Sequence, residues 1–286
     1  MIQEKQTIRP IHYLGSKLRM LEAIKDAIDS VVTKDGPICD LFSGSGTVSK
    51  FLVQFSDVIS VDIQKYSQVI CEAAMGRIET APEVDTVLAE IKSHKISIEL
   101  GKCLSELLTY EKQCLSRASK GNIDALYEII ENGSLFILEH TEEDTISDEL
   151  KSCMQISLDR ISESVLLDNT DSMISRYYGG LYFSYGQAFD LDCIAHWVFE
   201  QSGLLHTKAL AALLSTASDV VNTVGKQFAQ PLKVRNSKGE FKTSLLNKIL
   251  SDRAEDVYSG FAKWLTYYLG VGIIRMIITR YVTIML

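Results

Sequence analysis

Several common functional patterns are missing from this chain of 286 residues. Its six cysteines include no C-x-x-C pair, and its five histidines have no metal-ligand spacing, so we expect no disulfide framework and no metal site. No G-x-S-x-G or P-loop motif is present. The sequence also lacks a secretory signal and any run approaching the roughly 18 apolar residues of a membrane helix. We therefore expect a cytoplasmic protein with no membrane partner.

Charge is distributed unevenly along the chain. The net charge of −8 disfavours contact with phosphate groups if the whole molecule is considered. However, acidic residues concentrate between 139 and 171, whereas the segment 226–253 holds seven basic residues against Glu240 and Asp252. Because only the local distribution matters at a binding surface, the sequence still allows a basic face on an acidic protein.

The first part of the chain alternates between helical and strand patterns. Apolar residues at spacings of three and four predict a helix over 17–32. Residues 38–42 form a short apolar strand that leads into a glycine-rich turn, and residues 47–55 again have a helical pattern. A second strand at 58–62 and a helix over 64–78 follow. This order is typical of a βαβ unit in a parallel, doubly wound sheet.

The remainder of the chain has a different character. Residues 83–164 are rich in helix formers and show no clear strand pattern. Beyond them we expect an aromatic, glycine-rich loop or bent strand at 177–184, helices at 190–199 and 206–224, and a polar basic loop at 230–242. The final segment, 269–286, is apolar and has neither a helix nor a strand period.

The turn after the first strand has the sequence Asp40-Leu-Phe42-Ser-Gly44-Ser-Gly46. Glycines let the backbone pass close beneath a ligand because they have no Cβ. A dinucleotide fingerprint needs a third glycine, but Ser49 occupies its place. An acid before the first glycine suits an ammonium group better than a pyrophosphate. The turn therefore favours S-adenosylmethionine, with another nucleotide-binding βαβ unit as the alternative.

Two further segments could complete a nucleoside site. Asp62 ends the second strand, where a carboxylate can accept both ribose hydroxyls or can instead cap the next helix. Upstream, Tyr13-Leu-Gly15-Ser-Lys17 precedes a helix. Its exposed N–H groups and its lysine suit a carboxylate, and its tyrosine can pack on an adenine ring. A simple capped helix start is the alternative for this segment.

In this order and spacing, Y-L-G-S-K, D-L-F-S-G-S-G and V-D resemble the first three motifs of the D12 class of adenine-N6 DNA methyltransferases, over about residues 8 to 75. The segments 177–194 and 222–236 also resemble target-recognition segments of restriction-modification methylases in that class. The resemblance implies a site-specific enzyme that transfers methyl from S-adenosylmethionine to adenine N6 in double-stranded DNA. It assigns cofactor binding to Tyr13, Gly15, Lys17, Asp40, Phe42, Gly44, Gly46 and Asp62.

The motif that performs methyl transfer in this class, D/N-P-P followed by an aromatic, is not found, because none of the four prolines is adjacent to another. Either another polypeptide completes the enzyme, or a frameshift near 263–270 replaced the end of the chain. The first alternative implies a complementing methyltransferase chain or a cognate restriction endonuclease as partner. On this hypothesis the 286 residues alone are inactive, and a non-catalytic cofactor-binding or DNA-binding protein is the rival from another class.

The expected architecture is α/β, with a Rossmann-like S-adenosylmethionine-dependent methyltransferase core, a mainly helical insert, and a core left incomplete at its carboxyl end. We expect residues 1–82 to be the cofactor-binding part, 83–262 a helical and target-recognition region, and 263–286 an atypical tail. For DNA binding we expect the basic side chains to share one face, namely Lys226, Lys233, Arg235, Lys238 and Lys242.

Overall fold

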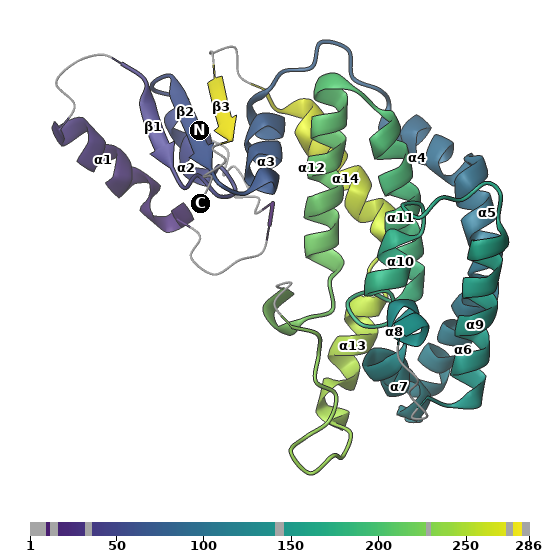
Figure 1. Cartoon of the computed structure of the whole chain (residues 1–286). Helices are drawn as coiled ribbons and strands as arrows, with labels where there is room; N and C mark the ends of the chain where they lie inside the picture. Colours follow the sequence, from purple (N-terminus) through teal and green to yellow (C-terminus); the bar gives the residue numbers. More distant parts are fainter. Residues whose placement is uncertain are drawn as a thin grey trace. The chain divides into compact units, whose positions relative to one another are not determined.

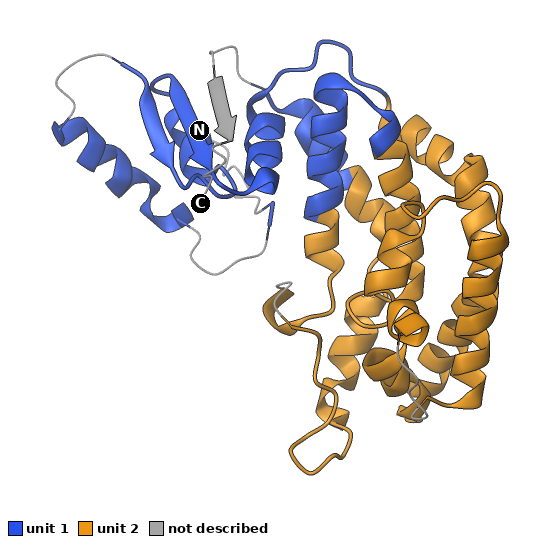
Figure 2. Cartoon of the chain, in the orientation of Figure 1, with its two compact units in different colours: residues 1–82, 199–215, 263–286 blue, residues 83–198, 216–262 orange. Residues whose placement is uncertain are grey.

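The computed structural model describes residues 10–11, 17–31, 36–140, 146–226, 230–272 and 277–281, and Figure 1 shows their helices and strands. The chain divides into two compact units, which Figure 2 distinguishes by colour. Unit 1 comprises residues 1–82, 199–215 and 263–286, and unit 2 comprises residues 83–198 and 216–262. The chain therefore leaves unit 1 and returns to it twice.

Unit 1 contains a three-stranded parallel sheet with the strand order β1-β2-β3. The strands are β1 (Ile38–Leu41), β2 (Val58–Asp62) and β3 (Ile277–Tyr281). The helix α2 (Thr47–Leu52) joins β1 to β2 and packs against both strands. The βαβ unit expected from the sequence is thus confirmed. The strand β3 pairs with β2 and belongs to the apolar segment 269–286, for which the sequence shows neither a helix nor a strand periodicity.

Three short helical segments of unit 1 follow the apolar periodicity of the sequence. The segment 17–31 consists of η1 (Lys17–Met20) and α1 (Leu21–Val31), and α3 (Lys65–Met75) follows β2. These elements and α2 confirm the helices predicted at 17–32, 47–55 and 64–78, although α2 and α3 end earlier. The core between α2 and the strands consists of Val48, Leu52, Val53 and Val58, against which Leu21, Ile24 and Ile28 of α1 pack.

A buried lysine joins three segments of unit 1. Lys208 lies on α12 (Gly203–Val220) and is fully buried. Its ammonium donates hydrogen bonds to the carbonyl oxygens of Ala73 and Val271, both at 2.9 Å, and to that of Tyr268. Ala73 is in the last turn of α3, and Tyr268 is in the last turn of α14 (Val257–Gly270). Carbonyls of a last turn lack partners within their helix, so Lys208 satisfies groups that the helices leave open.

The described residues of unit 2 are mainly helical, and the helices between 84 and 163 confirm the prediction for 83–164. Before residue 165 its helices are α4 (Val84–Ser93), α5 (Lys95–Cys103), α6 (Ser105–Ala118), α7 (Asp124–Asn132), α8 (Leu135–His140) and α9 (Asp148–Glu163). Later elements are α10 (Met173–Tyr178), α11 (Tyr185–Glu200), η2 (Val224–Lys226), η3 (Thr243–Leu245) and α13 (Leu246–Arg253). Among the described residues of the whole chain, no helix combines the length and apolarity needed to cross a bilayer.

The interior of unit 2 encloses an ion pair. The guanidinium of Arg253 donates from Nη1 to Glu111 Oε1 at 2.8 Å, and the two side chains are 1% and 4% exposed. Glu111 also accepts the N–H of Gly186 at 3.2 Å, and Arg253 donates to the carbonyl of Gly180. Burial raises the pKa of Glu111, and the charge of Arg253 opposes that rise. The pair connects α6 and α13 to the glycine-rich segment before α11.

The aromatic segment 177–184 differs from the expectation of a loop or bent strand. Tyr177 and Tyr178 end the helix α10, and only the residues after them form a turn, closed by a bridge between Gly179 and Phe183. The carboxylate of Asp192 explains the helix, because it accepts the N–H groups of Ile174 (2.7 Å) and Ser175 (2.8 Å). A cap supplied from α11 is invisible in the local sequence pattern.

Candidate functional site

The turn between β1 and α2 has an unusual backbone. Phe42, Gly44 and Gly46 all have positive φ angles, of 61°, 54° and 69°. A Cβ on Gly46 would lie 2.7 Å from the sulfur of Cys71, so both its conformation and its surroundings require glycine. Phe42 is not a glycine, yet it adopts the left-handed region with its side chain 74% exposed. The turn thus presents backbone and an aromatic side chain at the carboxyl end of β1.

Asp62 connects this turn to the end of the neighbouring strand. Its Oδ2 accepts the N–H of Gly44 at 2.8 Å, and its Oδ1 accepts the N–H of Gln64 at 2.9 Å. The acid at the end of β2 and the glycine turn after β1 are therefore in direct contact. The bond to Gln64 lies just before α3, so the carboxylate also has a local structural role, as the capping alternative proposed.

Asp40, the acid of β1, is held by two hydroxyl groups. Its Oδ2 accepts a hydrogen bond from Ser49 Oγ at 2.5 Å, and Ser49 Oγ accepts one from Ser60 Oγ at 2.7 Å. Both serines are buried. From the sequence, Ser49 is notable only because it occupies the place of the third glycine in a dinucleotide fingerprint, and no contact with Asp40 is predicted. Ser49 lies in α2, nine residues after Asp40. The two side chains meet because α2 packs against the strands.

The upstream part of the predicted site is only partly described. Tyr13 and Gly15 lie outside the described residues, and Lys17 is exposed at the start of η1. The structure therefore joins the second and third predicted segments through Asp62 and Gly44. The assignment of Tyr13, Gly15 and Lys17 to the same pocket stays a prediction.

The predicted basic residues all belong to unit 2, and some of them have acidic partners. Lys226 pairs with Glu255 at 2.8 Å, and Arg235 pairs with Glu131 at 2.9 Å. The other three are Lys242, which donates to the carbonyl of Lys233, and the exposed residues Lys233 and Lys238. A bridge between Arg235 and Phe241 makes the loop a short hairpin, and the guanidinium lies 3.9 Å from the centre of the Phe241 ring. DNA binding by this hairpin stays a prediction.

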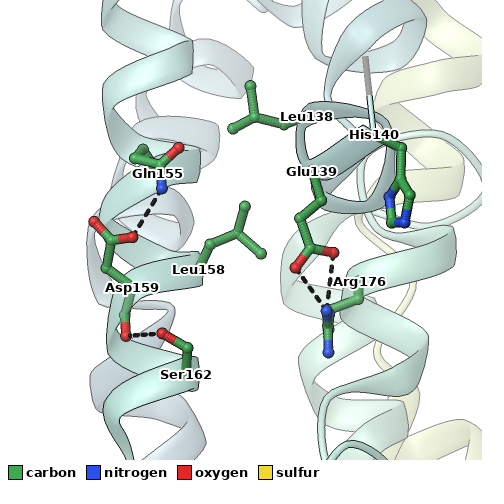
Figure 3. Close-up of a pocket in the computed structure, with 8 residues that line it drawn as sticks. All are labelled: Leu138, Glu139, His140, Gln155, Leu158, Asp159, Ser162 and Arg176. Atoms are coloured by element: carbon green, nitrogen blue, oxygen red, sulfur yellow. Dashed lines mark hydrogen bonds and ion pairs between the residues drawn. The ribbon is translucent and has the colours of Figure 1, made fainter. Parts of the chain in front are cut away.

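Unit 2 also has an open pocket of about 620 Å³ between α8, α9 and α10, which Figure 3 shows. Glu139 and Arg176 face each other across one side and form an ion pair at 2.6 Å. On the opposite side Asp159 accepts a hydrogen bond from Gln155 at 2.8 Å. Among the described residues, none of those predicted for cofactor or DNA binding lines this pocket, and its ion pair of Glu139 with Arg176 leaves Asp159 bonded only to the neutral Gln155.

Two histidines meet in unit 2 although their sequence spacing predicts no site. The ring centres of His94 and His196 lie 4.7 Å apart. Nδ1 of His94 accepts the N–H of Ile96 at 3.3 Å, which caps α5, and Nδ1 of His196 lies 2.7 Å from Asp171 Oδ1. Each ring therefore has a structural role through its Nδ1.

Residues 13–148 match the family of D12 class N6 adenine-specific DNA methyltransferases. The match confirms the resemblance predicted from the motifs, and it covers slightly less than half of the chain. It includes β1, the glycine turn, β2 and the helices of unit 2 as far as the start of α9. No curated protein and no solved structure matches the chain. At the level of the family, the match supports adenine-N6 methylation of DNA and the use of S-adenosylmethionine that this chemistry requires.

Proposed function

We propose that unit 1 binds S-adenosylmethionine, and that the chain serves methylation of adenine N6 in double-stranded DNA within a restriction-modification system. The observation that carries this proposal is the bond from the Gly44 N–H to Asp62, because it unites two motifs at the ends of adjacent parallel strands. Ligands of open α/β sheets bind at this edge. The βαβ unit likewise supports a Rossmann-like methyltransferase core.

The residues at this edge fit the proposed cofactor chemically. Each oxygen of Asp62 accepts one backbone N–H, and a carboxylate oxygen has a second lone pair with which it can accept a ribose hydroxyl. The two N–H bonds fix the orientation of the carboxylate. At Gly44, which has a positive φ angle, no side chain lies between the backbone of the turn and a ligand. The bound cofactor would supply a methyl group on a positively charged sulfur.

Substitution of Asp62 tests the cofactor proposal. Asp62→Ala removes the acceptor for both hydroxyls and should weaken S-adenosylmethionine binding by about 1–3 kcal/mol, measured by isothermal titration calorimetry. Asp62→Asn removes the charge but keeps one oxygen that can accept the Gly44 N–H. It therefore separates the effect of the charge from the effect of losing the hydrogen bond to the turn. Asp57→Ala is the matched control, because Asp57 is an exposed acid next to the amino end of the same strand. Equal affinities for the wild type and Asp62→Ala would refute the proposal.

The basic hairpin of unit 2 is our proposed contact with DNA phosphates. Charge reversal of Lys233 and Arg235 together should weaken binding to duplex DNA and reduce the dependence of affinity on salt by about one phosphate contact per residue. Because Arg235 already pairs with Glu131, phosphate must compete with that carboxylate. The control is Lys120→Glu, at an exposed position elsewhere in unit 2. Unchanged affinity and salt dependence would exclude the hairpin as the DNA-binding surface.

We further propose that methyl transfer needs an acid-Pro-Pro-aromatic segment in addition to these 286 residues, for example from a complementing methyltransferase chain. Such a segment would accept the protons of the adenine amine, whose nitrogen is a weak nucleophile. The test is transfer of labelled methyl to DNA by the 286-residue chain, alone and with a protein that carries this segment. Transfer by the chain alone at about 0.01 to 1 per second would refute the requirement. Cofactor binding without transfer in either mixture would favour the rival function of a non-catalytic binding protein.

A further inference from the structure

Three side chains from three elements of unit 1 form a directed chain of hydrogen bonds. Asp40 on β1 and Ser60 on β2 are register partners in the parallel sheet, and Ser49 on α2 lies between their side chains. Ser60 donates to Ser49 at 2.7 Å, and Ser49 donates to Asp40 at 2.5 Å. An ionised carboxylate only accepts hydrogen bonds, so the order of donors along the chain is fixed.

The position of the two serines indicates a role beyond packing. Ser49 and Ser60 are 0% and 3% exposed, and Val48 and Leu52 beside Ser49 belong to the apolar core of unit 1. Burying a hydroxyl is unfavourable unless it is hydrogen-bonded, so an apolar residue would suit these positions better if packing alone mattered. The hydroxyl of Ser60 donates to that of Ser49, and Ser49 in turn donates to the Asp40 carboxylate, so Ser60 acts on Asp40 only through Ser49. Short hydrogen bonds to a carboxylate are strong and restrict its rotation.

We infer that Ser49 and Ser60 are positioning residues that orient the Asp40 carboxylate toward the ammonium group of the cofactor's amino-acid portion. This inference rests on the proposed function. Within the part of the chain that the structure describes, Asp40 accepts its only hydrogen bond at Oδ2, so Oδ1 is the oxygen for the ligand. A fixed carboxylate attracts a cation without first losing rotational freedom on binding.

Binding of two ligands can distinguish a role of the serines in orienting Asp40 from a role in the general stability of the site. S-adenosylmethionine carries the ammonium group, whereas 5′-methylthioadenosine shares its adenosine and sulfur but lacks the amino-acid portion. Ser49→Ala should weaken binding of S-adenosylmethionine about 10-fold, as expected for loss of a hydrogen bond to a charged group, and should leave methylthioadenosine binding within about twofold. Ser60→Ala should act in the same direction with a smaller effect, and Ser60→Thr, which keeps the hydroxyl, should restore the affinity. Ser30→Ala, at an exposed serine of α1, is the matched control.

A double-mutant cycle provides the decisive measurement. If the serines act through Asp40, Ser49→Ala should have almost no further effect on S-adenosylmethionine affinity in an Asp40→Asn background. Independent, multiplicative effects would overturn the inference, and so would an equal loss of both ligands in a Ser49→Ala protein whose thermal midpoint is unchanged. If the wild type binds neither ligand, the proposed function itself fails, which is a different result from a failure of positioning.

Discussion

Replacement of Lys208 by methionine should destabilise unit 1 substantially. Methionine has a similar volume, so the substitution leaves little cavity, but it removes the donor to three carbonyl oxygens. A buried polar group that loses its partner costs about 1–3 kcal/mol, and breaking a buried charged interaction costs about 3–5 kcal/mol. The three carbonyls share one donor, so their contributions are not additive. We expect a loss of about 3 kcal/mol.

The two tryptophans make this loss measurable in unit 1 alone. Trp264 belongs to unit 1 and Trp197 to unit 2. In a Trp197→Phe background, fluorescence of the buried Trp264 reports the unfolding of unit 1. A loss of 3 kcal/mol should lower the thermal midpoint by about 12 °C for a unit of 123 residues, because the unfolding entropy is about 2.1 cal/mol/K per residue. Lys65→Met, at an exposed lysine of the same unit, should change it little.

Titration of Lys208 adds a pH dependence with a definite sign. Burial lowers the pKa of Lys208 from 10.5 to about 8. Between these two values the unfolded chain binds a proton that the folded chain has released, so the unfolding free energy should rise as pH rises from 8 to 10.5. Below pH 8 the contribution should be constant. A Lys208→Met protein as stable as the wild type would refute this account, because the cost of burying the ammonium would then cancel its three hydrogen bonds. An unchanged pH profile would show that Lys208 does not titrate between these pH values.

Two other substitutions test the interiors of the two units. Glu111→Gln should lower the unfolding free energy of unit 2 by about 3 kcal/mol, because the buried guanidinium of Arg253 loses its counter-charge. Urea denaturation followed by Trp197 fluorescence measures this, and a change below about 1 kcal/mol would contradict it. Gly46→Ala should cost at least about 1–2 kcal/mol from its positive φ, plus a clash with Cys71. If Cys71→Ala does not relieve any of that cost, the clash is not its source.

Local patterns in the sequence predict much of this molecule, because the elements concerned depend on neighbouring residues. The spacing of Leu21, Ile24 and Ile28 gives the first helix, and the strand-turn-helix order around Gly44 gives the βαβ unit. The direct contact between Asp62 and Gly44 also follows from the rule that parallel strands end at one edge.

The features that the sequence does not reveal all depend on residues distant in the chain. The helix that contains Tyr177 is capped by Asp192, and within the described part of the chain the strand at 277–281 pairs with β2. In the sequence Ser49 is only a serine at the place of a motif glycine. Its contacts with Asp40 and Ser60 depend on the packing of α2 against the strands. Lys208 lies in an apolar helical pattern, and its burial is explained only by carbonyls from two other helices. No local periodicity carries such information.

The pairing of β2 with β3 has a consequence for the order in which the molecule can fold. Val58 pairs with Ile277, so one edge of β2 stays unpaired until about 219 further residues have been synthesised. At about 5–20 residues per second, this delay is roughly 10–45 seconds. During that time most of unit 2 has emerged from the ribosome and can fold through its local helix contacts. The open edge of β2 is then a site where a nascent chain can pair with another molecule, and chaperone binding should be strongest in this interval.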